Sequence, residues 1–173
     1  MNKSLLVSLC AATLILTACE KKTNESPTST SRTSATTAPA QASLSTGNSA
    51  DMKSDSTAIQ TLSSTRAQEA LTLQQEMMKA AQNGDKSAIT GIVDNLKTYI
   101  TNFNNDLDGL ALKSSEGASL RDKMKEANTL SLSLSEESIK MPPDTAKLQQ
   151  LQTQAMELQK TVLAEMQALQ AVK

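Results

Sequence analysis

The sequence contains no histidine, and this absence excludes more chemistry than any other feature of its composition. Haem bundles need an axial histidine, di-iron bundles use Glu-x-x-His pairs, and zinc sites favour histidine and cysteine. A serine activated by a histidine base is excluded for the same reason. We therefore expect no catalytic residues, no metal site and no cofactor, and we predict that the protein is not an enzyme.

Aromatic residues are almost as scarce, because Tyr99 and Phe103 are the only two in 173 residues. Ligand pockets and tight interfaces depend on aromatic side chains for rigid contact area, so their scarcity argues against a sugar or nucleobase site. Charge of one sign is also missing, since 17 Lys and Arg stand against 18 Asp and Glu. This balance gives no electrostatic reason to bind nucleic acid.

The one long apolar run lies at the N-terminus. Residues 4–17 are apolar and follow Lys3, and a small residue, Ala18, closes the segment. The run is too short for a permanent transmembrane helix, which needs about 20 residues. A basic start, an apolar centre and a small residue at the junction are typical of an export signal. We predict that residues 1–18 are a signal peptide.

The residues at this junction carry a family resemblance. Leu16-Thr17-Ala18-Cys19 resembles, at every position, the lipobox Leu-[Ala/Ser/Thr]-[Gly/Ala]-Cys of bacterial lipoproteins. The resemblance implies cleavage by signal peptidase II before Cys19, which becomes an N-palmitoyl, S-diacylglycerol cysteine. Several acyl chains on one residue bind a membrane almost permanently, because each buried CH₂ contributes about 0.8 kcal/mol.

Glu20, directly after that cysteine, bears on the choice of membrane. In enteric-type lipoproteins an aspartate at this position retains the protein in the inner membrane, and glutamate does not. The resemblance therefore implies a lipid-anchored outer-membrane protein, with its domain in the periplasm or at the cell surface.

The segment from Cys19 to residue 55 is rich in Ser and Thr and is interrupted by Pro27 and Pro39. Large apolar residues are nearly missing, so the segment cannot bury enough surface to offset its ordering entropy. We predict that residues 19–55 form a lipidated cysteine and a disordered linker. Because Cys10 lies in the signal and Cys19 carries lipid, no internal disulfide is expected, and stability must come from packing.

Helical spacing of apolar residues begins at residue 56, and we predict one domain over residues 56–173. Turn signals at Asn83-Gly84, Ser114–Gly117 and Met141–Pro143 divide it. The predicted helices run over about 56–82, 86–112, 116–140 and 144–172. Four such helices with short breaks predict an all-α fold, an antiparallel up-down-up-down bundle.

Three local features depart from a simple amphipathic pattern. Residues 129–135 alternate Leu with Ser or Thr, a strand-like period, but no second strand could pair with them, so a helix is predicted. Arg66 falls in the apolar register of the first helix, where it either pairs with an acid across the bundle or extends to solvent. Glu165 falls on the heptad-like, coiled-coil seam of the last helix.

We expect the domain to act by contacting another protein or the cell envelope. Two other function classes stay open. One is periplasmic ligand or metal handling through an apolar core or through scattered methionines, although such methionines favour packing. The other is neutralisation of a toxin or hydrolase by an immunity-type lipoprotein.

The C-terminal residue, Lys173, suggests one specific form of envelope contact. The chain ends a heptad-like helix with a lysine, and in this it resembles the murein lipoprotein, whose terminal lysine is joined to peptidoglycan. Residues 170–172 depart from that family, which has Tyr-Arg before the lysine. The alternative is that this lysine has no covalent role and only interacts favourably with the negative C-terminal end of the helix dipole.

Overall fold

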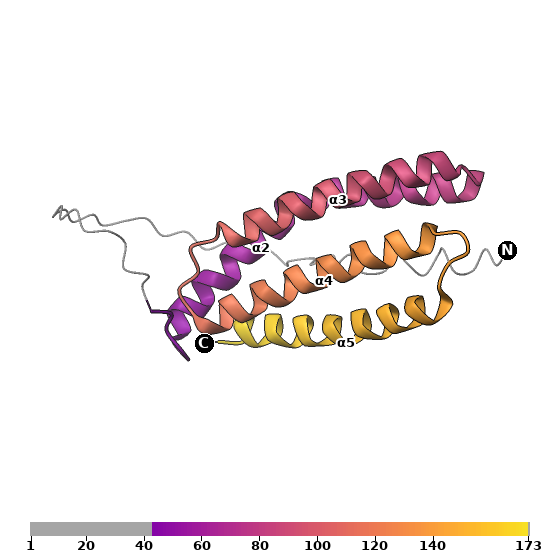
Figure 1. Ribbon diagram of the computed structural model, residues 1–173. Coiled ribbons are helices and arrows are strands. Elements are labelled where there is room, and N and C mark those ends of the chain that lie inside the picture. The colour runs from indigo at the N-terminus through magenta and orange to yellow at the C-terminus, as the bar shows by residue number, and fades with distance from the viewer. Residues whose placement is uncertain (1–42, 173) are drawn as a thin grey trace.

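Four helices form an antiparallel up-down-up-down bundle in the computed structural model, which describes residues 43–172 (Figure 1). They are α2 (Ser49–Asn83), α3 (Lys86–Asp108), α4 (Ser115–Ile139) and α5 (Thr145–Gln170). Between residues 43 and 172 the only extended pairing is an isolated parallel β-bridge between Ser45 and Ser114. The predicted all-α bundle is confirmed. The predicted signal peptide, Cys19, Glu20 and Lys173 lie outside the described residues.

Each helix begins at a residue whose side chain accepts a hydrogen bond from the first turn, which satisfies a backbone N–H that the helix itself leaves free. These caps are Asn48, Asp85, Ser114 and Asp144. Helix α2 ends at Gly84, whose φ of 66° is the left-handed conformation that glycine adopts without steric cost. The predicted turn at Asn83-Gly84 is therefore confirmed.

The first helix begins at Ser49, so the predicted start at residue 56 was wrong by seven residues. Met52 is the one large apolar residue among residues 49–55, which is too few to reveal a helix in the sequence, yet Met52, Asp55 and Ile59 lie on one face at helical spacing. Asp55 is only 1% exposed. The folded domain therefore includes residues that composition assigned to the linker.

Helix α3 ends at Asp108, four residues before the predicted end at 112. Leu110 and Leu112 continue the apolar pattern, but they belong to a turn in which the Leu112 N–H donates to the Leu110 carbonyl. Both side chains pack against the core from this non-helical position. The apolar pattern therefore indicates core residues correctly, but the predicted helical conformation of residues 109–112 is wrong.

Residues 129–135, whose alternation resembles a strand, lie within α4 as predicted. Their hydroxyl groups are compatible with a helix because they bond back to its own carbonyls. Thr129 Oγ1 donates to the Lys125 carbonyl at 2.9 Å, and Ser135 Oγ donates to the Ser131 carbonyl at 2.9 Å. Leu134 is buried, so the segment also contributes to packing.

The shared core lies at one end of the bundle, the end where α2 and α4 begin and α3 and α5 end. We call it the proximal end, because residue 43 and the C-terminus of α5 both lie there, and we call the opposite end distal (Figure 1). Leu107 and Leu120 are at most 1% exposed. The core cluster consists of Ile59, Phe103, Leu107, Leu120, Met124, Val162, Met166 and Leu169. The two helical hairpins, α2–α3 and α4–α5, are thus joined mainly at the proximal end.

Candidate functional site at the proximal end of the bundle

The chain enters the bundle at the proximal end through residues 45–47, which lie along the start of α4. The Ser45 N–H donates to the Lys113 carbonyl at 2.9 Å, and the Ser115 N–H donates to the Ser45 carbonyl at 2.8 Å. The Gly47 N–H donates to Glu116 Oε1 at 2.9 Å. This bond is the main reason why the pKa of Glu116 lies below its ordinary value. Residues 45–47 therefore belong to the folded domain.

Asp55 accepts hydrogen bonds from three donor groups of the connection between α3 and α4. Its Oδ1 lies 2.9 Å from the Lys113 nitrogen, and its Oδ2 lies 2.7 Å from the Ser114 nitrogen and 2.6 Å from Ser114 Oγ. A carboxyl group with this many donors is buried without leaving a polar atom unsatisfied. We call residues 45–47, Asp55 and residues 113–117 the clasp, because together they join the start of the chain to the junction of the two hairpins.

Gly117 completes the clasp by having no side chain. A Cβ atom at this position would lie 2.5 Å from Asp55 Oδ2 and 2.7 Å from Asp55 Cβ. The Gly117 N–H also donates to Ser114 Oγ at 3.0 Å, which caps α4. Glycine at this position lets α4 begin directly beside the buried carboxyl group.

The Asp55 carboxyl group accepts a hydrogen bond from the Ser114 hydroxyl group, an arrangement that some hydrolytic sites also contain. Asp55 is 1% exposed and Ser114 is 0% exposed, so no substrate atom can reach the hydroxyl oxygen. That oxygen also accepts the bond from the Gly117 N–H. The pair holds the connection in place and is not positioned for nucleophilic attack.

Arg66 pairs with an acid across the bundle, which decides between the two alternatives for this residue. Its Nε donates to Asp106 Oδ2 of α3 at 2.9 Å, and its Nη1 lies 3.1 Å from Glu69 Oε2. The hydrogen bond with Asp106 is the main cause that raises the pKa of Arg66. Tyr99 lies close by, and burial raises the pKa of its phenol.

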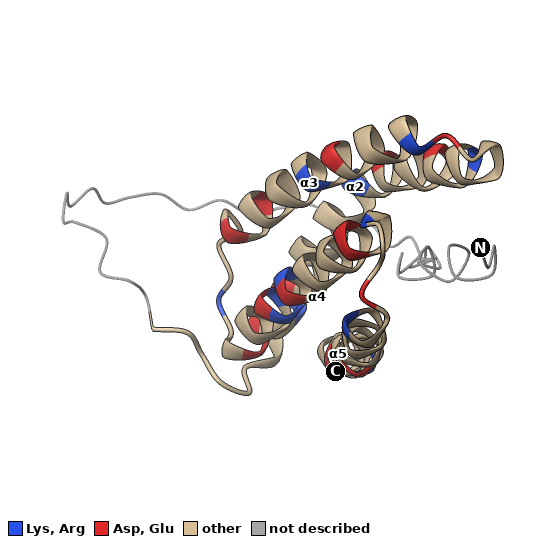
Figure 2. Cartoon of the chain, turned by 45° about the vertical axis from the view of Figure 1, so that its right-hand side comes forward, with Lys and Arg blue, Asp and Glu red and all other residues tan. Residues whose placement is uncertain are grey.

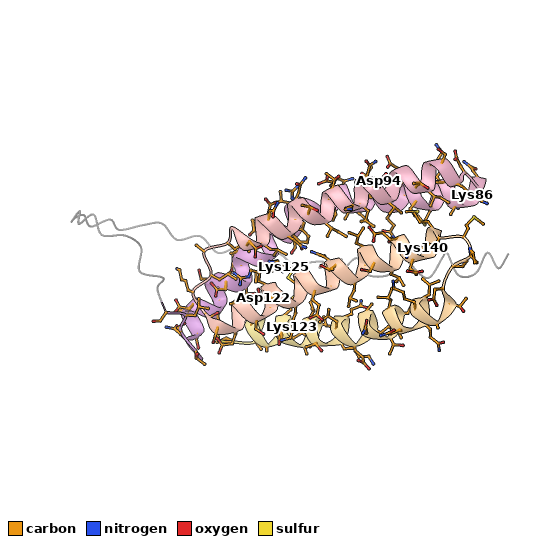
Figure 3. All side chains as sticks on the ribbon, in the orientation of Figure 1. Lys86, Asp94, Asp122, Lys123, Lys125 and Lys140 are labelled. Atoms are coloured by element: carbon orange, nitrogen blue, oxygen red, sulfur yellow. The ribbon has the colours of Figure 1, made fainter. Side chains whose placement is uncertain are left out.

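Two lysines on α4 form ion pairs in opposite directions. Lys123 pairs with Glu165 of α5, and Lys125 pairs with Asp108 of α3 at 2.6 Å. In Figure 3 their labels lie on the two sides of α4, toward α5 and toward α3. Glu165, which the sequence placed on the seam of the last helix, therefore meets a cation there. Asp106 and Asp108 of α3 therefore belong to separate ion pairs, with Arg66 and with Lys125.

Glu137 holds the distal end of the α4–α5 hairpin. Its side chain is 4% exposed, and its Oε2 lies 2.8 Å from Lys140 Nζ and 3.1 Å from Lys147 Nζ. The hydrogen bonds with Lys140 and Lys147 hold the pKa of Glu137 below its ordinary value of 4.5. The same contact raises the pKa of Lys140.

Methionine side chains and one surface depression are the other positions at which a ligand or metal could bind. Met124 and Met166 belong to the core cluster, whereas Met78 and Met156 are exposed on different helices. Within residues 43–172 no group of three or more His, Cys, Asp or Glu could hold a metal ion. An open depression of about 370 Å³ lies between α2 and α3, and its lining residues are Glu69, Thr72, Leu73, Glu76, Asn95, Thr98 and Tyr99.

Positions occupied by Lys or Arg and by Asp or Glu occur on every helix and are interspersed along the chain (Figure 2). No helix in the part of the chain that the structure describes is long and apolar enough to cross a bilayer. Several of these charged residues form ion pairs that join neighbouring helices.

Sequence reasoning missed Asp55, the central residue of the clasp. Its partners Lys113 and Ser114 are 58 and 59 positions away, so no local pattern contains the contact. The available signal was the spacing of Met52, Asp55 and Ile59 after Asn48, a good N-cap residue. An acidic residue in an otherwise apolar register indicates a buried polar contact.

We expect Gly117→Ala to destabilise the domain by about 1–3 kcal/mol, because the added methyl group overlaps the Asp55 carboxyl group. Gly91→Ala is the matched control, since its Cβ meets no atom within 4 Å in the middle of α3. Alanine there should stabilise the helix by about 0.5–1 kcal/mol. Urea unfolding followed by circular dichroism at 222 nm measures the free energy of unfolding of each variant. A change of the same sign in both variants would contradict the role of Gly117 in the clasp.

Glu137 should make stability depend on pH in the acidic range. The pKa of Glu137 is lower in the folded state than its ordinary value of 4.5. The contribution of Glu137 to the free energy of unfolding is therefore fully present above pH 4.5, and it is lost as the pH falls through the folded-state pKa. We expect Glu137→Gln to have a lower Tm than wild type at pH 7, and a smaller fall in Tm between pH 5 and pH 3. Glu157→Gln, at an exposed position of α5, should leave the wild-type pH profile unchanged.

Comparison with known proteins gives one result. No curated protein and no solved structure matches the chain. A family model with the description "Uncharacterised lipoprotein PM1805" matches residues 53–172, which is most of the chain and nearly all of the helical bundle. The chain is therefore a member of this lipoprotein family.

Proposed function

We propose that this protein is an outer-membrane lipoprotein whose helical domain makes non-catalytic contacts with another protein or with the cell wall. The lipid on Cys19 holds the chain at the membrane, and the bundle provides the contact surface. The domain lies in the periplasm or at the cell surface.

The anchor is supported by the lipobox and by the lipoprotein family to which the bundle belongs. Cys19 and the first described residue, Ser43, are separated by some two dozen positions. Such a length spans roughly 80 Å at most when fully extended. The lipid would therefore restrict the bundle to a layer next to the membrane surface.

The non-catalytic role is supported by one observation above the others, which is the way the buried polar groups are used. Asp55 and Ser114 bond to each other and to the backbone at the junction of the hairpins. Glu137 bonds to Lys140 and Lys147 between α4 and α5. Groups of this kind perform chemistry in enzymes only when a substrate reaches them, and here they join helices.

A contact role is supported by the surface of α5. Met156 is 57% exposed and Leu163 is 41% exposed, seven residues apart on the same outer face. The exposed side chains of Gln149 and Gln167 share this face, and the exposed Lys160 lies between the two apolar residues. Apolar residues bordered by polar groups are common where proteins meet.

Anchoring and sorting are tested with two single variants. Cys19→Ser should abolish incorporation of labelled palmitate and release the protein from sedimented envelopes. Glu20→Asp should keep the label but move the protein from the outer-membrane to the inner-membrane fraction. A Cys19→Ser protein that still sediments with membranes would refute the anchor, whereas an unmoved Glu20→Asp protein would refute only the sorting role of Glu20.

The contact role is tested by site-specific photo-crosslinking in intact cells, with a photoreactive residue at Met156 or Leu163. We expect discrete adducts of the full-length anchored protein, and adducts with the cell wall should shift in mass after muramidase digestion. Thr57, exposed near the start of α2, provides a control position. The absence of adducts at both α5 positions, or identical adducts at Thr57, would contradict a specific contact through α5.

A further inference from the structure

The connection between α3 and α4 joins the two helical hairpins, and its sequence explains its conformation only in part, through Gly109 at its start and Ser114 at its end. Residues 109–114 read Gly-Leu-Ala-Leu-Lys-Ser, and Leu, Ala and Lys are good helix formers. The apolar pattern of α3 also continues through Leu110. The helix nevertheless ends at Asp108. Gly109 disfavours continuation of α3, and a contact from outside the segment holds the helix-forming residues that follow it in a non-helical conformation.

Asp55 supplies that contact through two backbone N–H groups. In the structure, the N–H groups of Lys113 and Ser114 donate to its carboxyl oxygens at 2.9 and 2.7 Å. If α3 and α4 formed one continuous helix, the same two groups would donate to the carbonyls of residues 109 and 110. Each N–H group can serve only one of these arrangements. A continuous helix would also leave a buried carboxyl group without its backbone donors, which is costly.

We propose that the connection 109–114 is a two-state element that Asp55 holds in its non-helical form. Without this carboxyl group, α3 and α4 join into one helix, and the hairpins exchange between two copies of the chain. In the exchanged dimer, α2–α3 of one copy packs on α4–α5 of the other. The core and the ion pairs between hairpins are then remade between copies, so the connection decides which form prevails.

The pair Asn104 and Asn128 distinguishes the two forms. Asn128 Nδ2 of α4 donates to Asn104 Oδ1 of α3 at 2.8 Å, so this contact crosses between the hairpins. A disulfide formed by Asn104→Cys and Asn128→Cys is internal in the monomer and links two chains in the exchanged dimer. The natural cysteines are Cys10 and Cys19. Neither provides a free thiol in a cleaved and lipidated chain.

The control pair lies within one hairpin. Ser119 Oγ of α4 is 3.4 Å from Glu165 Oε2 of α5. A disulfide formed by Ser119→Cys and Glu165→Cys therefore stays internal in both forms. Both cysteine pairs are placed in the full-length lipoprotein, oxidised in the membrane, solubilised in detergent and compared on non-reducing gels.

With Asp55 present, both pairs should give monomers. Asp55→Asn should raise the disulfide-linked dimer at least tenfold for the Asn104/Asn128 pair and leave the Ser119/Glu165 pair monomeric. Adding Ala111→Pro to Asp55→Asn should restore the monomer, because proline within the connection prevents a continuous helix. A monomeric disulfide in the Asp55→Asn chain, or dimers of both cysteine pairs, would overturn the proposal.

A second variant keeps the proposal testable if Asp55→Asn loses its helical circular dichroism. Gly109→Ala leaves Asp55 in place and favours a continuous helix, and its Cβ would lie 3.4 Å from the Asp106 carbonyl, an ordinary contact. In that case an increase in the linked dimer for Gly109→Ala supports the proposal, and an unchanged monomer refutes it.

Discussion

The burial of one carboxyl group determines the conformation of the proximal end of the bundle. Asp55 lies inside the protein, where a carboxyl group needs hydrogen-bond donors, and its donors come from the backbone and hydroxyl group of the α3–α4 connection. To provide them, the connection has to leave the helical conformation after Asp108, and Ser114 has to begin α4 at that point. Gly117, in the first turn of α4, lies so close to the Asp55 carboxyl group that it has no space for a side chain. Three local features of the chain thus have a single cause.

The charged side chains contribute mainly to the choice of neighbouring helix. Arg66 connects α2 to α3, Lys125 connects α4 to α3, and Lys123 connects α4 to α5. Partly exposed ion pairs of this kind add little to stability, about 0–1 kcal/mol each. Apolar packing alone discriminates weakly between different orders of the helices. Opposite charges at the same level along neighbouring helices favour one order. The ion pairs therefore complement the aliphatic core by favouring the observed order of helices.

The helices themselves could be predicted because the information lies within each segment. Apolar residues recur at helical spacing in α3 and α5, and caps such as Asp85 and Asp144 are visible beside them. The two wrong boundaries, the start of α2 at Ser49 and the end of α3 at Asp108, both lie close to the clasp in the sequence. There the conformation depends on contacts between residues 58 or 59 positions apart, and a single sequence carries no record of such a distance. The partner of Arg66 was undecided for the same reason, since periodicity gives the face of a helix and not the neighbour opposite it.

The position of the clasp has a consequence for a chain that belongs to a lipoprotein family. Any force or restraint from the N-terminal side reaches the bundle through residues 45–47, which bond to the start of α4 and not only to α2. Both hairpins are therefore held directly at the point where the chain enters. The shared core lies at that same end, whereas the buried apolar side chains nearer the distal end, such as Val93 and Leu134, lie outside the core cluster. Local opening is easiest where few apolar contacts are buried. Fluctuations should consequently begin at the distal turns, while the end that connects to the N-terminal segment stays closed.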